Sequence, residues 1–340
     1  MSDHPIAPTR RSLLGAGAAL GTLATASLFE GAASASTPAQ TADLSGKSVL
    51  ITGASSGFGR LAALRAARSG AKTIATMRNL DGGRRSEARE LAEIAAREQL
   101  DLHLVELDVN DAMMVRSAVA EGERLAGGAL DALVNNAGIG LSGPVELTDD
   151  QGLDLIFDTN VFGYMRTARA ALPAMRRARR GLIINVSSQL GRVVMPGVGA
   201  YAATKHAVEA MFEAMAYELA PHGVEVTIVQ PGGYPTNIWR TGERLSDEMV
   251  ARSGEEQRAA YAEFLAASRR RFAGGGTTDP DDVAKAIIEI IALPLGRRPL
   301  RRPVHPNTRG TDAINACAAQ VQSAALGNGP FAPWHAAVTD

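Results

Sequence analysis

The chain has 340 residues, and its 35 basic and 36 acidic side chains leave a formal net charge of −1, which gives no indication of a polyanion-binding surface. Hydrophobic residues make up 46% of the chain and charged residues 21%, proportions that exclude a disordered or collagen-like protein. The single cysteine, Cys317, excludes an internal disulfide, and no Cys/His cluster has the spacing of a structural zinc site.

The first 43 residues have the layout of a targeting segment. Arg10 and Arg11 precede an apolar run rich in Ala and Gly, residues 13–29, which is followed by a small-residue cleavage site and a polar spacer. The stretch Thr9-Arg10-Arg11-Ser12-Leu13-Leu14 resembles the bacterial twin-arginine export motif. The resemblance implies cleavage after about Ala35 and a periplasmic or extracellular protein. An uncleaved anchor, or a signal that is not used and leaves the protein in the cytoplasm, is the alternative. No later segment approaches the length of a transmembrane helix.

From Leu44 onward, short apolar and β-branched runs alternate with amphipathic stretches. This alternation is typical of βαβ units, and it predicts an α/β fold: a single doubly wound Rossmann-type domain with a mostly parallel sheet of about seven strands flanked by helices. The expected strands are Ser48–Thr52, Lys72–Thr76, His103–Leu107, Ala132–Asn135, Leu182–Val186, Val224–Val229 and an edge strand at Leu300–Val304. The expected helical stretches are Gly59–Arg68, Ser86–Glu98, Ala112–Leu125, Asp149–Arg177, Tyr201–Leu219 and Asp281–Ala292.

The regular alternation ends at Thr236. Residues 237–278 are charged and helical, with a break at Gly254 and three glycines near the end, and we interpret them as a mobile lid over the site. The last residues show no informative pattern. The expected organisation is a signal segment and spacer at 1–43, a catalytic domain at 44–306 that includes the lid, and a C-terminal tail at 307–340.

A glycine-rich loop follows the first expected strand. The sequence Thr52-Gly53-Ala54-Ser55-Ser56-Gly57-Phe58-Gly59 leads directly into a helix. The glycines allow a sharp turn and a close approach to a pyrophosphate, and the helix N-terminus offers free N–H groups and the positive end of its dipole. A plain tight turn would need only one glycine, so the loop predicts a nucleotide-binding site.

The spacing T-G-x-x-x-G-x-G resembles the classical short-chain dehydrogenase/reductase family, and later motifs extend the resemblance from about Leu44 to Leu293. These motifs are Asp108-Val109, Asn135-Asn136-Ala137-Gly138, Asn160, Asn185-Val186-Ser187-Ser188, Tyr201-Ala202-Ala203-Thr204-Lys205 and Pro231-Gly232 with Thr236. The resemblance implies that Asp108 and Val109 hold the adenine and that Thr236 holds the nicotinamide carboxamide. The cofactor-binding residues we expect are Gly53, Ser55, Ser56, Gly57, Phe58, Gly59, Arg78, Asp108, Val109, Asn136, Ala137, Gly138, Tyr201, Lys205, Pro231, Gly232 and Thr236.

The charge at the end of the second strand bears on the choice between NAD and NADP. Dehydrogenases that prefer NAD usually place an acid there, which binds the ribose 2′-hydroxyl and would repel a 2′-phosphate. Here the strand end reads Ala75-Thr76-Met77-Arg78-Asn79, with one arginine and no acid. Because Arg78 can make charge-assisted hydrogen bonds to a 2′-phosphate, we expect NADP(H) to be preferred over NAD(H). An exposed Arg78 without a ligand would leave the preference undecided.

Tyr201 and Lys205 lie one turn apart on one face of an expected helix. A nearby ammonium stabilises the phenolate and lowers the tyrosine pKa, which makes Tyr201 a credible general acid/base. On spacing alone, a packing and surface pair is the commoner explanation. The family resemblance implies that Ser188 polarises the substrate carbonyl, that Tyr201 exchanges a proton with its oxygen, and that Lys205 also binds the nicotinamide ribose. Ser187 is the competing serine, and Asn160 either supports a proton relay or is a satisfied buried amide.

These residues together predict an NADP(H)-dependent alcohol dehydrogenase or carbonyl reductase with a small-molecule substrate. The segments 76–78 and 231–236 look like the subgroup that acts on retinoids, steroids or other lipophilic alcohols and ketones. A nucleotide sensor that keeps the fold without catalysis is the main alternative, and the glycine spacing disfavours a nucleotide-sugar epimerase or dehydratase. We expect no metal and no nucleic acid partner, and the resemblance implies a homodimer or tetramer formed through residues 149–177 and 201–219.

Overall fold

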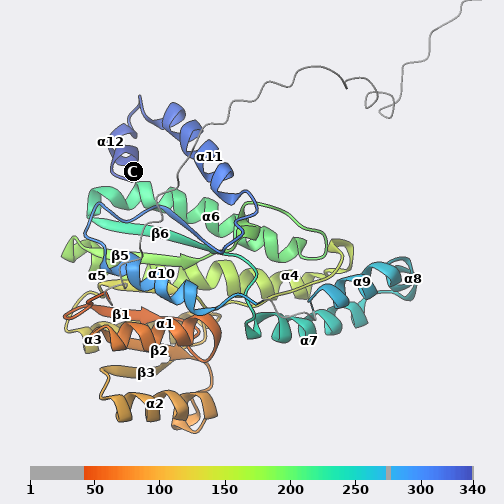
Figure 1. Ribbon diagram of the computed structural model, residues 1–340, viewed down its shortest axis with the longest axis horizontal. Helices are drawn as coiled ribbons and strands as arrows, with labels where there is room; N and C mark the ends of the chain where they lie inside the picture. The colour runs from red at the N-terminus through yellow and green to blue at the C-terminus, as the bar shows by residue number, and fades with distance from the viewer. Residues whose placement is uncertain (1–41, 273–276, 339–340) are drawn as a thin grey trace, which may run out of the picture. The chain divides into compact units, whose positions relative to one another are not determined.

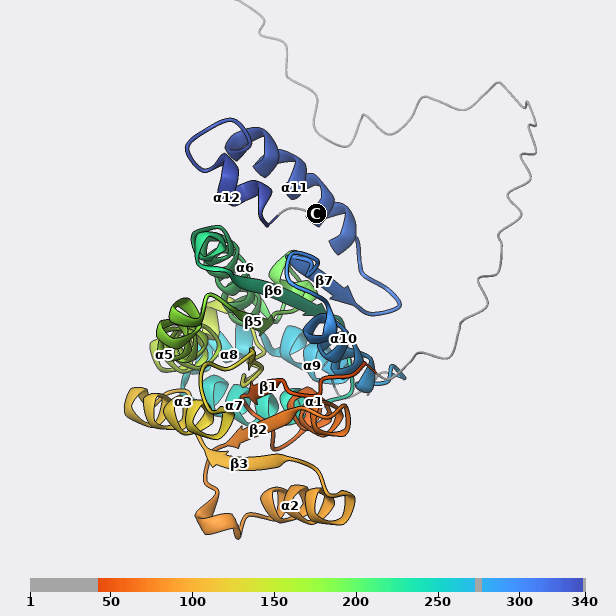
Figure 2. The same ribbon diagram turned by 90° about the vertical axis from the view of Figure 1, so that its left-hand side faces the viewer.

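Parallel strands form the centre of the fold. The computed structural model describes residues 42–272 and 277–338, and its strands are β1 (Ser48–Ile51), β2 (Lys72–Met77), β3 (Leu102–Glu106), β4 (Ala132–Asn135), β5 (Gly181–Val186), β6 (Val224–Pro231) and β7 (Arg301–Val304). They pair in the order β3-β2-β1-β4-β5-β6-β7, and every neighbouring pair is parallel (Figure 2). The chain runs outward from β1 to β3 and then from β4 to β7, which is the doubly wound arrangement. The predicted fold class is confirmed.

Helices cover both faces of this sheet (Figure 1). They are α1 (Gly57–Arg68), α2 (Ser86–Glu98), α3 (Ala112–Ala126), α4 (Asp150–Phe157), α5 (Gly163–Ala178), α6 (Gly199–Leu219), α7 (Asn237–Arg252), α8 (Glu255–Ala260), α9 (Ala262–Phe272), α10 (Asp281–Ala292), α11 (Thr311–Leu326) and α12 (Ala332–Ala336). Figure 2 shows α1 and α10 on one face and α3, α5 and α6 on the other. In the described residues, no helix has the length and apolar character needed to cross a bilayer.

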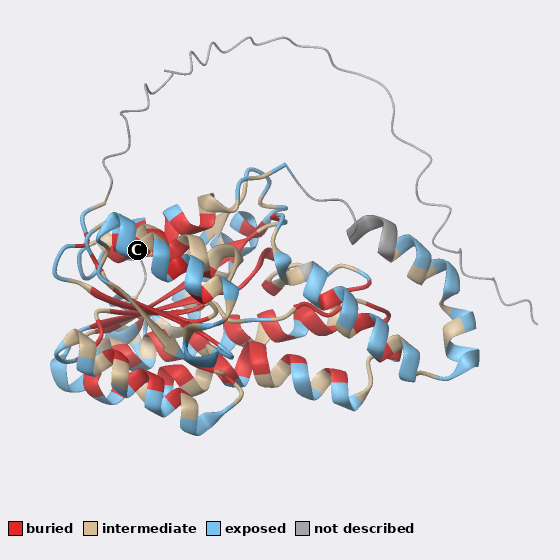
Figure 3. Cartoon of the chain, turned by 90° about the horizontal axis from the view of Figure 1, so that it is seen from below, coloured by how far each residue is buried: buried red, intermediate tan, exposed pale blue. Residues whose placement is uncertain are grey.

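The strands are buried on both faces because their side chains alternate between two apolar layers. In β1, Val49 and Ile51 pack in the layer that contains α1 and α10, whereas Leu50 packs in the layer that contains α3, α5 and α6. Figure 3 shows the strands as a buried band between helices with exposed outer sides. Continuous apolar runs in the sequence therefore correspond to the central strands, whereas the edge strand β3 is only partly buried.

The predicted helical segment at 149–177 is not one continuous α-helix. α4 ends at Phe157, and a π-helical turn occupies Asp158–Phe162 before α5 begins. Asn160, in the middle of this turn, is fully buried, and its amide bonds to the backbone of Ile139. One extra residue in a helical turn hardly alters the hydrophobic period, which is why the sequence did not reveal it.

In its described part, residues 237–272 and 277–278, the predicted lid contains the helices α7, α8 and α9. α7 ends at Arg252, and Gly254 precedes α8, so the predicted interruption is confirmed. α7 is anchored by Met249, which is 1% exposed, whereas α8 has no buried residue. The three glycines near the end of the predicted lid lie within residues 273–276, outside the described residues, and the predicted mobility is not tested.

The ends of the chain differ in what the structure adds to the sequence analysis. The export signal predicted at 1–43 lies outside the described residues, apart from positions 42 and 43. The tail contains α11 and α12, which the sequence analysis missed. His335 of α12 is buried and stacks on Tyr217 of α6, with ring centroids 5.8 Å apart. The first α11 residue, Thr311, is also buried, but most of this helix is exposed and nearly uncharged, so it has no clear amphipathic pattern.

A buried ionic cluster ties α6 to the last strand of the sheet. Arg301 of β7 donates from Nε to Glu209 at 2.8 Å and from Nη2 to Glu213 at 2.5 Å. The side chains of Arg301 and Glu209 are 8% and 2% exposed, and Gln230 of β6 donates a further hydrogen bond to Glu209 at 2.9 Å. Burial acts to raise the pKa of Glu213, but the hydrogen bond from Arg301 holds that pKa below its usual range. One arginine thus compensates two carboxylates on α6.

Replacing this arginine should destabilise the fold strongly. Arg301→Met leaves two carboxylates without their cation, and we expect the free energy of unfolding to fall by about 3–5 kcal/mol. The matched control is Arg302→Met in the same strand, where the side chains of Arg302 and Glu289 are 50% and 60% exposed. An exposed pair contributes about 1 kcal/mol or less. Urea unfolding of the two variants measures the difference, and equal losses would contradict a special role for Arg301.

Candidate active site

The glycine loop lies against the end of β4. The Thr52 hydroxyl accepts hydrogen bonds from the backbone N–H groups of Asn136 and Ala137, at 2.9 and 3.0 Å. Gly53 has a φ of +70°, and a Cβ atom there would lie 2.8 Å from the Ala137 Cα. The Asn136 side-chain amide also donates a hydrogen bond to the Thr52 carbonyl at 2.8 Å, which holds the end of β4 against the glycine loop. The first glycine is therefore required by backbone conformation and by space.

The last glycine of the loop, Gly59, lies where there is no room for a side chain. A Cβ atom at Gly59 would collide with the carbonyl oxygen of Gly53 and with the Asn136 side chain. α1 begins at Gly57, and its N-cap residue, Ser56, makes no side-chain capping hydrogen bond. The first N–H groups of this helix are therefore not satisfied by a side-chain cap, as an anion-binding helix end requires.

A cavity of about 980 Å³ runs along the carboxyl ends of the strands. Most of the predicted residues line it: Gly53, Ser55, Ser56, Gly57, Phe58, Arg78, Asp108, Val109, Asn136, Ala137, Gly138, Ser188, Tyr201, Lys205, Pro231, Gly232 and Thr236. Gly59 and Asn160 do not line the cavity. The topology explains this gathering, because ligands bind in open α/β sheets at the strand ends where the order reverses.

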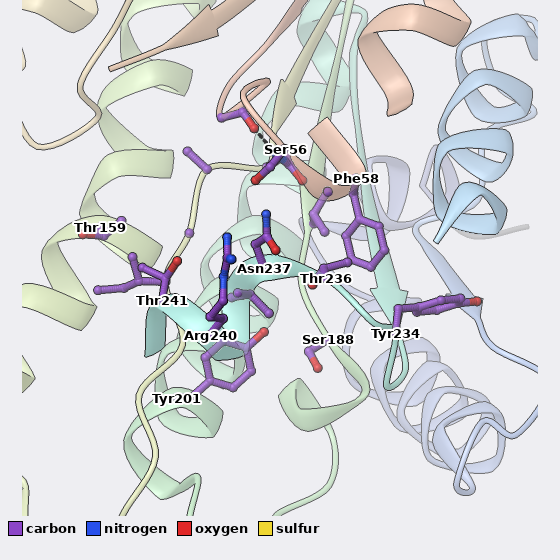
Figure 4. Close-up of a pocket in the computed structure, with 18 of the residues that line it drawn as sticks. Ser56, Phe58, Thr159, Ser188, Tyr201, Tyr234, Thr236, Asn237, Arg240 and Thr241 are labelled. Carbon is purple, nitrogen blue, oxygen red and sulfur yellow. Dashed lines mark hydrogen bonds between the residues drawn. The ribbon is translucent and has the colours of Figure 1, made fainter. Parts of the chain in front are cut away.

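Tyr201 and Lys205 project from α6 toward the end of β5. Lys205 is 3% exposed, and its Nζ donates to the Val186 carbonyl at 2.9 Å. The same Nζ lies 5.7 Å from the centre of the Tyr201 ring and 5.2 Å from that of Tyr164. Ser188 hydrogen-bonds to Tyr201, which favours this serine over Ser187. Figure 4 shows Ser188 and Tyr201 in the lower part of the pocket.

Burial controls the ionisation of both groups. It raises the pKa of Tyr201 to about 12, and the hydrogen bond from Ser188 only partly opposes this rise. Burial also lowers the pKa of Lys205 to about 7, against the attraction of Glu209. The sequence analysis expected a lowered tyrosine pKa, and the direction in the structure is the opposite. Desolvation of the phenolate is the largest cause of this rise.

Asn160 lies behind the cavity wall. Its carbonyl oxygen accepts from the Ile139 N–H at 2.9 Å, and its amide donates to the Ile139 carbonyl at 3.0 Å and to the Thr204 hydroxyl at 3.2 Å. Thr204 immediately precedes Lys205 on α6. The geometry therefore gives Asn160 the contacts of a satisfied buried amide that fixes the loop after β4 against α6.

The far end of the cavity carries charged groups of both signs. Arg78 lies 3.8 Å from the Asp108 carboxylate, and its side chain is 57% exposed. The sequence analysis missed Arg85, which also lines the cavity and donates to the Arg78 carbonyl at 2.7 Å. Arg85 pairs with Glu87 and lowers the pKa of that carboxyl group to about 2. Its position in the loop after β2 could have suggested it from sequence.

An aromatic contact series that the sequence did not reveal supports the opposite side. Tyr234 packs edge-to-face on Phe58 of the glycine loop, at 5.6 Å between ring centroids, and on His305 after β7, at 5.3 Å. The carbonyl of Asn307 accepts a hydrogen bond from Gln189 at 2.8 Å. The segment after β7 therefore contributes to the wall around the site, although it is distant in sequence from every motif. Among the described residues, no His, Cys, Asp and Glu cluster could hold a metal ion.

The buried lysine should make stability depend on pH. Between a native pKa of about 7 and an unfolded value of about 10.4, the unfolded chain binds more protons at this site. The free energy of unfolding should therefore rise with pH by up to about 1.4 kcal/mol per unit across this range. We expect wild type to gain stability relative to Lys205→Met between about pH 7.5 and 9, measured by urea unfolding. The stability difference between wild type and the control Lys285→Met, which keeps Lys205 and removes a partly exposed lysine, should stay flat over the same range. A flat difference between wild type and Lys205→Met would refute the interpretation.

Known proteins share this architecture over most of its length. The family described as short chain dehydrogenase matches residues 47–245. Retinol dehydrogenase 8 of Bos taurus is 36% identical over 79% of this chain and 84% of its own. The 3-ketodihydrosphingosine reductase of Bacteroides thetaiotaomicron is 33% identical over 72% of this chain and 83% of its own.

A solved structure extends the comparison to the cofactor. A short-chain dehydrogenase/reductase from Burkholderia phymatum in complex with NAD is 27% identical, with a TM-score of 0.67, and the match covers 85% of this chain and 97% of that one. The free helix end and the glycine loop fit a nicotinamide dinucleotide as cofactor. The matched family, the relatives and the geometry of the site agree, and the chain belongs to the short-chain dehydrogenase/reductase family of oxidoreductases.

Proposed function

We propose that this protein is an NADP(H)-dependent oxidoreductase that interconverts an alcohol and a ketone or aldehyde. The observation that carries the proposal is the grouping of Ser188, Tyr201 and Lys205 in the cavity lining, where Ser188 bonds to Tyr201 and the buried lysine Nζ lies 5.7 Å from the centre of the Tyr201 ring. A protein that only senses a nucleotide has no need for an acid/base tyrosine hydrogen-bonded to a serine.

The side chains divide the work of proton transfer. When bound, the cofactor supplies or accepts the hydride at its nicotinamide. The Ser188 hydroxyl and the Tyr201 hydroxyl would bind the substrate oxygen, and Tyr201 would donate a proton to it in reduction or accept one in oxidation. The ammonium form of Lys205 stabilises the tyrosinate that reduction leaves behind. Because the native tyrosine pKa lies near 12, this stabilisation is needed for turnover at neutral pH.

The preference for NADP(H) rests on the guanidinium groups at the far end of the cavity. The Arg78 side chain is 57% exposed, and its one ion pair, with Asp108, is long at 3.8 Å. Its guanidinium group therefore remains accessible to a phosphate. Arg85 stands next to it but is held by Glu87. A 2′-phosphate would therefore meet one accessible arginine and a second that is already paired.

A lipophilic substrate fits the wall nearest the catalytic residues. Leu190, Met195, Val198 and Ile238 line the cavity and pack in one apolar cluster with Tyr201, and Leu265 also lines the cavity. The names of two relatives, retinol dehydrogenase 8 and 3-ketodihydrosphingosine reductase, denote enzymes of lipid-like molecules. Both observations support an alcohol or ketone with an apolar body.

Turnover tests the proposal directly. We expect the purified protein to oxidise NADPH faster than NADH with a panel of lipophilic ketones and aldehydes, and Tyr201→Phe to lower kcat by about two or more orders of magnitude. Tyr217→Phe is the matched control, because this tyrosine lies on the same helix, bonds to Glu213 and does not line the cavity. Tight nucleotide binding without turnover on any substrate would support the sensor alternative instead.

We also propose that residues 1–43 direct export and that the protein forms a homodimer or tetramer. The paired Arg10 and Arg11 support the first proposal. Replacing both with lysine should retain the protein in the cytoplasm, and unchanged export in cell fractionation would contradict a twin-arginine signal.

Exposed Leu155 and Phe162, on and beside α4, support the proposal of a homodimer or tetramer. A mass of a single chain by light scattering would contradict it.

A further inference from the structure

Arg240 lies in the first turn of α7 and lines the cavity. Figure 4 shows its side chain rising between Tyr201 and Ser56, with the guanidinium nitrogens at the end nearer Ser56. Ser56 is the N-cap residue of α1, in the glycine loop. The sequence analysis assigned no role to Arg240, because a single arginine in a charged helical segment looks like a solvated residue.

The charge of Arg240 is not compensated within the part of the chain that the structure describes. Arg78 and Arg85 in the same cavity each face a carboxylate, Asp108 and Glu87 respectively. Arg240 forms no ion pair with any described carboxylate, including Glu243, three residues further along α7. An exposed guanidinium in a cavity lacks a partner of opposite charge, which a bound anion could supply.

The backbone under Arg240 is held firmly in place. A Cβ atom at Gly242 would lie 2.7 Å from the Gly140 carbonyl oxygen, so α7 lies directly on the loop after β4. The Ser246 hydroxyl accepts from the Ser142 N–H at 2.8 Å and donates to the Gly242 carbonyl. At the start of the helix, Thr236 faces the glycine loop. A Cβ atom added at Gly57 would lie 3.5 Å from the Cβ atom of Thr236. The distance from α7 to the glycine loop is therefore set by packing.

We propose that Arg240 binds the diphosphate of the cofactor from the side opposite the glycine loop. The loop and the N-terminus of α1 supply backbone N–H groups from one side, and the planar guanidinium can supply two hydrogen bonds from the other. This inference rests on the proposed function, since it takes a dinucleotide as the ligand. The diphosphate is common to NAD(H) and NADP(H), so Arg240 strengthens binding of both and contributes nothing to the choice between them. Arg78, by contrast, bears only on the 2′-phosphate.

Cofactor titrations separate these two roles. For Arg240→Gln, we expect the Kd values of NADPH, NADH and ADP-ribose all to rise by about tenfold or more, because each carries the diphosphate. For Arg78→Gln, we expect the Kd of NADPH alone to rise by a comparable factor. Arg244→Gln is the matched control on the same helix, since Arg244 pairs with Glu248 on the exposed side and does not line the cavity. It should leave all three Kd values within about twofold.

Each outcome of the titration decides the question. Kd values for Arg240→Gln within about twofold of wild type would overturn the proposal, whether or not the KM of a carbonyl substrate changes. A rise for NADPH only would also overturn it, and would place Arg240 at the 2′-phosphate. Failure of the wild-type protein to bind any of the three nucleotides would refute the proposed function and this inference with it. The melting temperature of each variant shows that a loss of binding is not a loss of folding.

Discussion

The buried amine of Lys205 is the constraint on which the site depends. An amine that is 3% exposed must find nearly all its stabilisation within the protein, and here the Val186 carbonyl accepts its hydrogen bond. The Tyr164 hydroxyl donates to the same carbonyl at 3.0 Å, and the faces of two tyrosine rings lie beside Nζ. These contacts fix α6 against the end of β5. Because Tyr201 lies one turn before Lys205, the same contacts aim its hydroxyl into the cavity.

The edge strand β7 helps to hold this lysine through Glu209. Glu209, one turn after Lys205, attracts its charge and is itself compensated by Arg301 of β7. Gln230 joins Glu209 to Asn315 of α11, which donates back to Gln230 at 2.7 Å. Residues beyond position 300 therefore help to hold α6 against the sheet. A carboxylate that is 2% exposed would be costly if it were unpaired, so the edge strand is needed for the stability of α6 as well as of the sheet.

The central fold could be predicted from the sequence because strands that are buried on both faces appear as short continuous runs of apolar residues. Every strand from β1 to β7 was predicted within one or two residues, and Gly53 and Gly59 occupy positions where a side chain would collide. What the sequence could not supply depends on long-range packing. The contact of His305 with Tyr234 follows from where distant loops meet. The π-helical turn around Asn160 adds one residue to a long helical segment and hardly changes its hydrophobic period. The pKa of Tyr201 is raised, where the sequence analysis expected it to be lowered, because burial desolvates the phenolate.

The segment predicted as a lid combines a fixed part with a part that has few constraints. The start of α7 is held by Thr236, Gly242 and Ser246 against the two loops that frame the cofactor cleft, and Met249 is buried beneath it. α8, further along the chain, buries no residue and can vary without disturbing the sheet. Chemistry requires atoms placed to a fraction of an ångström, whereas accommodation of an apolar substrate requires only volume and apolar surface. The residues nearest the glycine loop are therefore the more tightly fixed by packing, and α8 is the part of this segment with the fewest constraints.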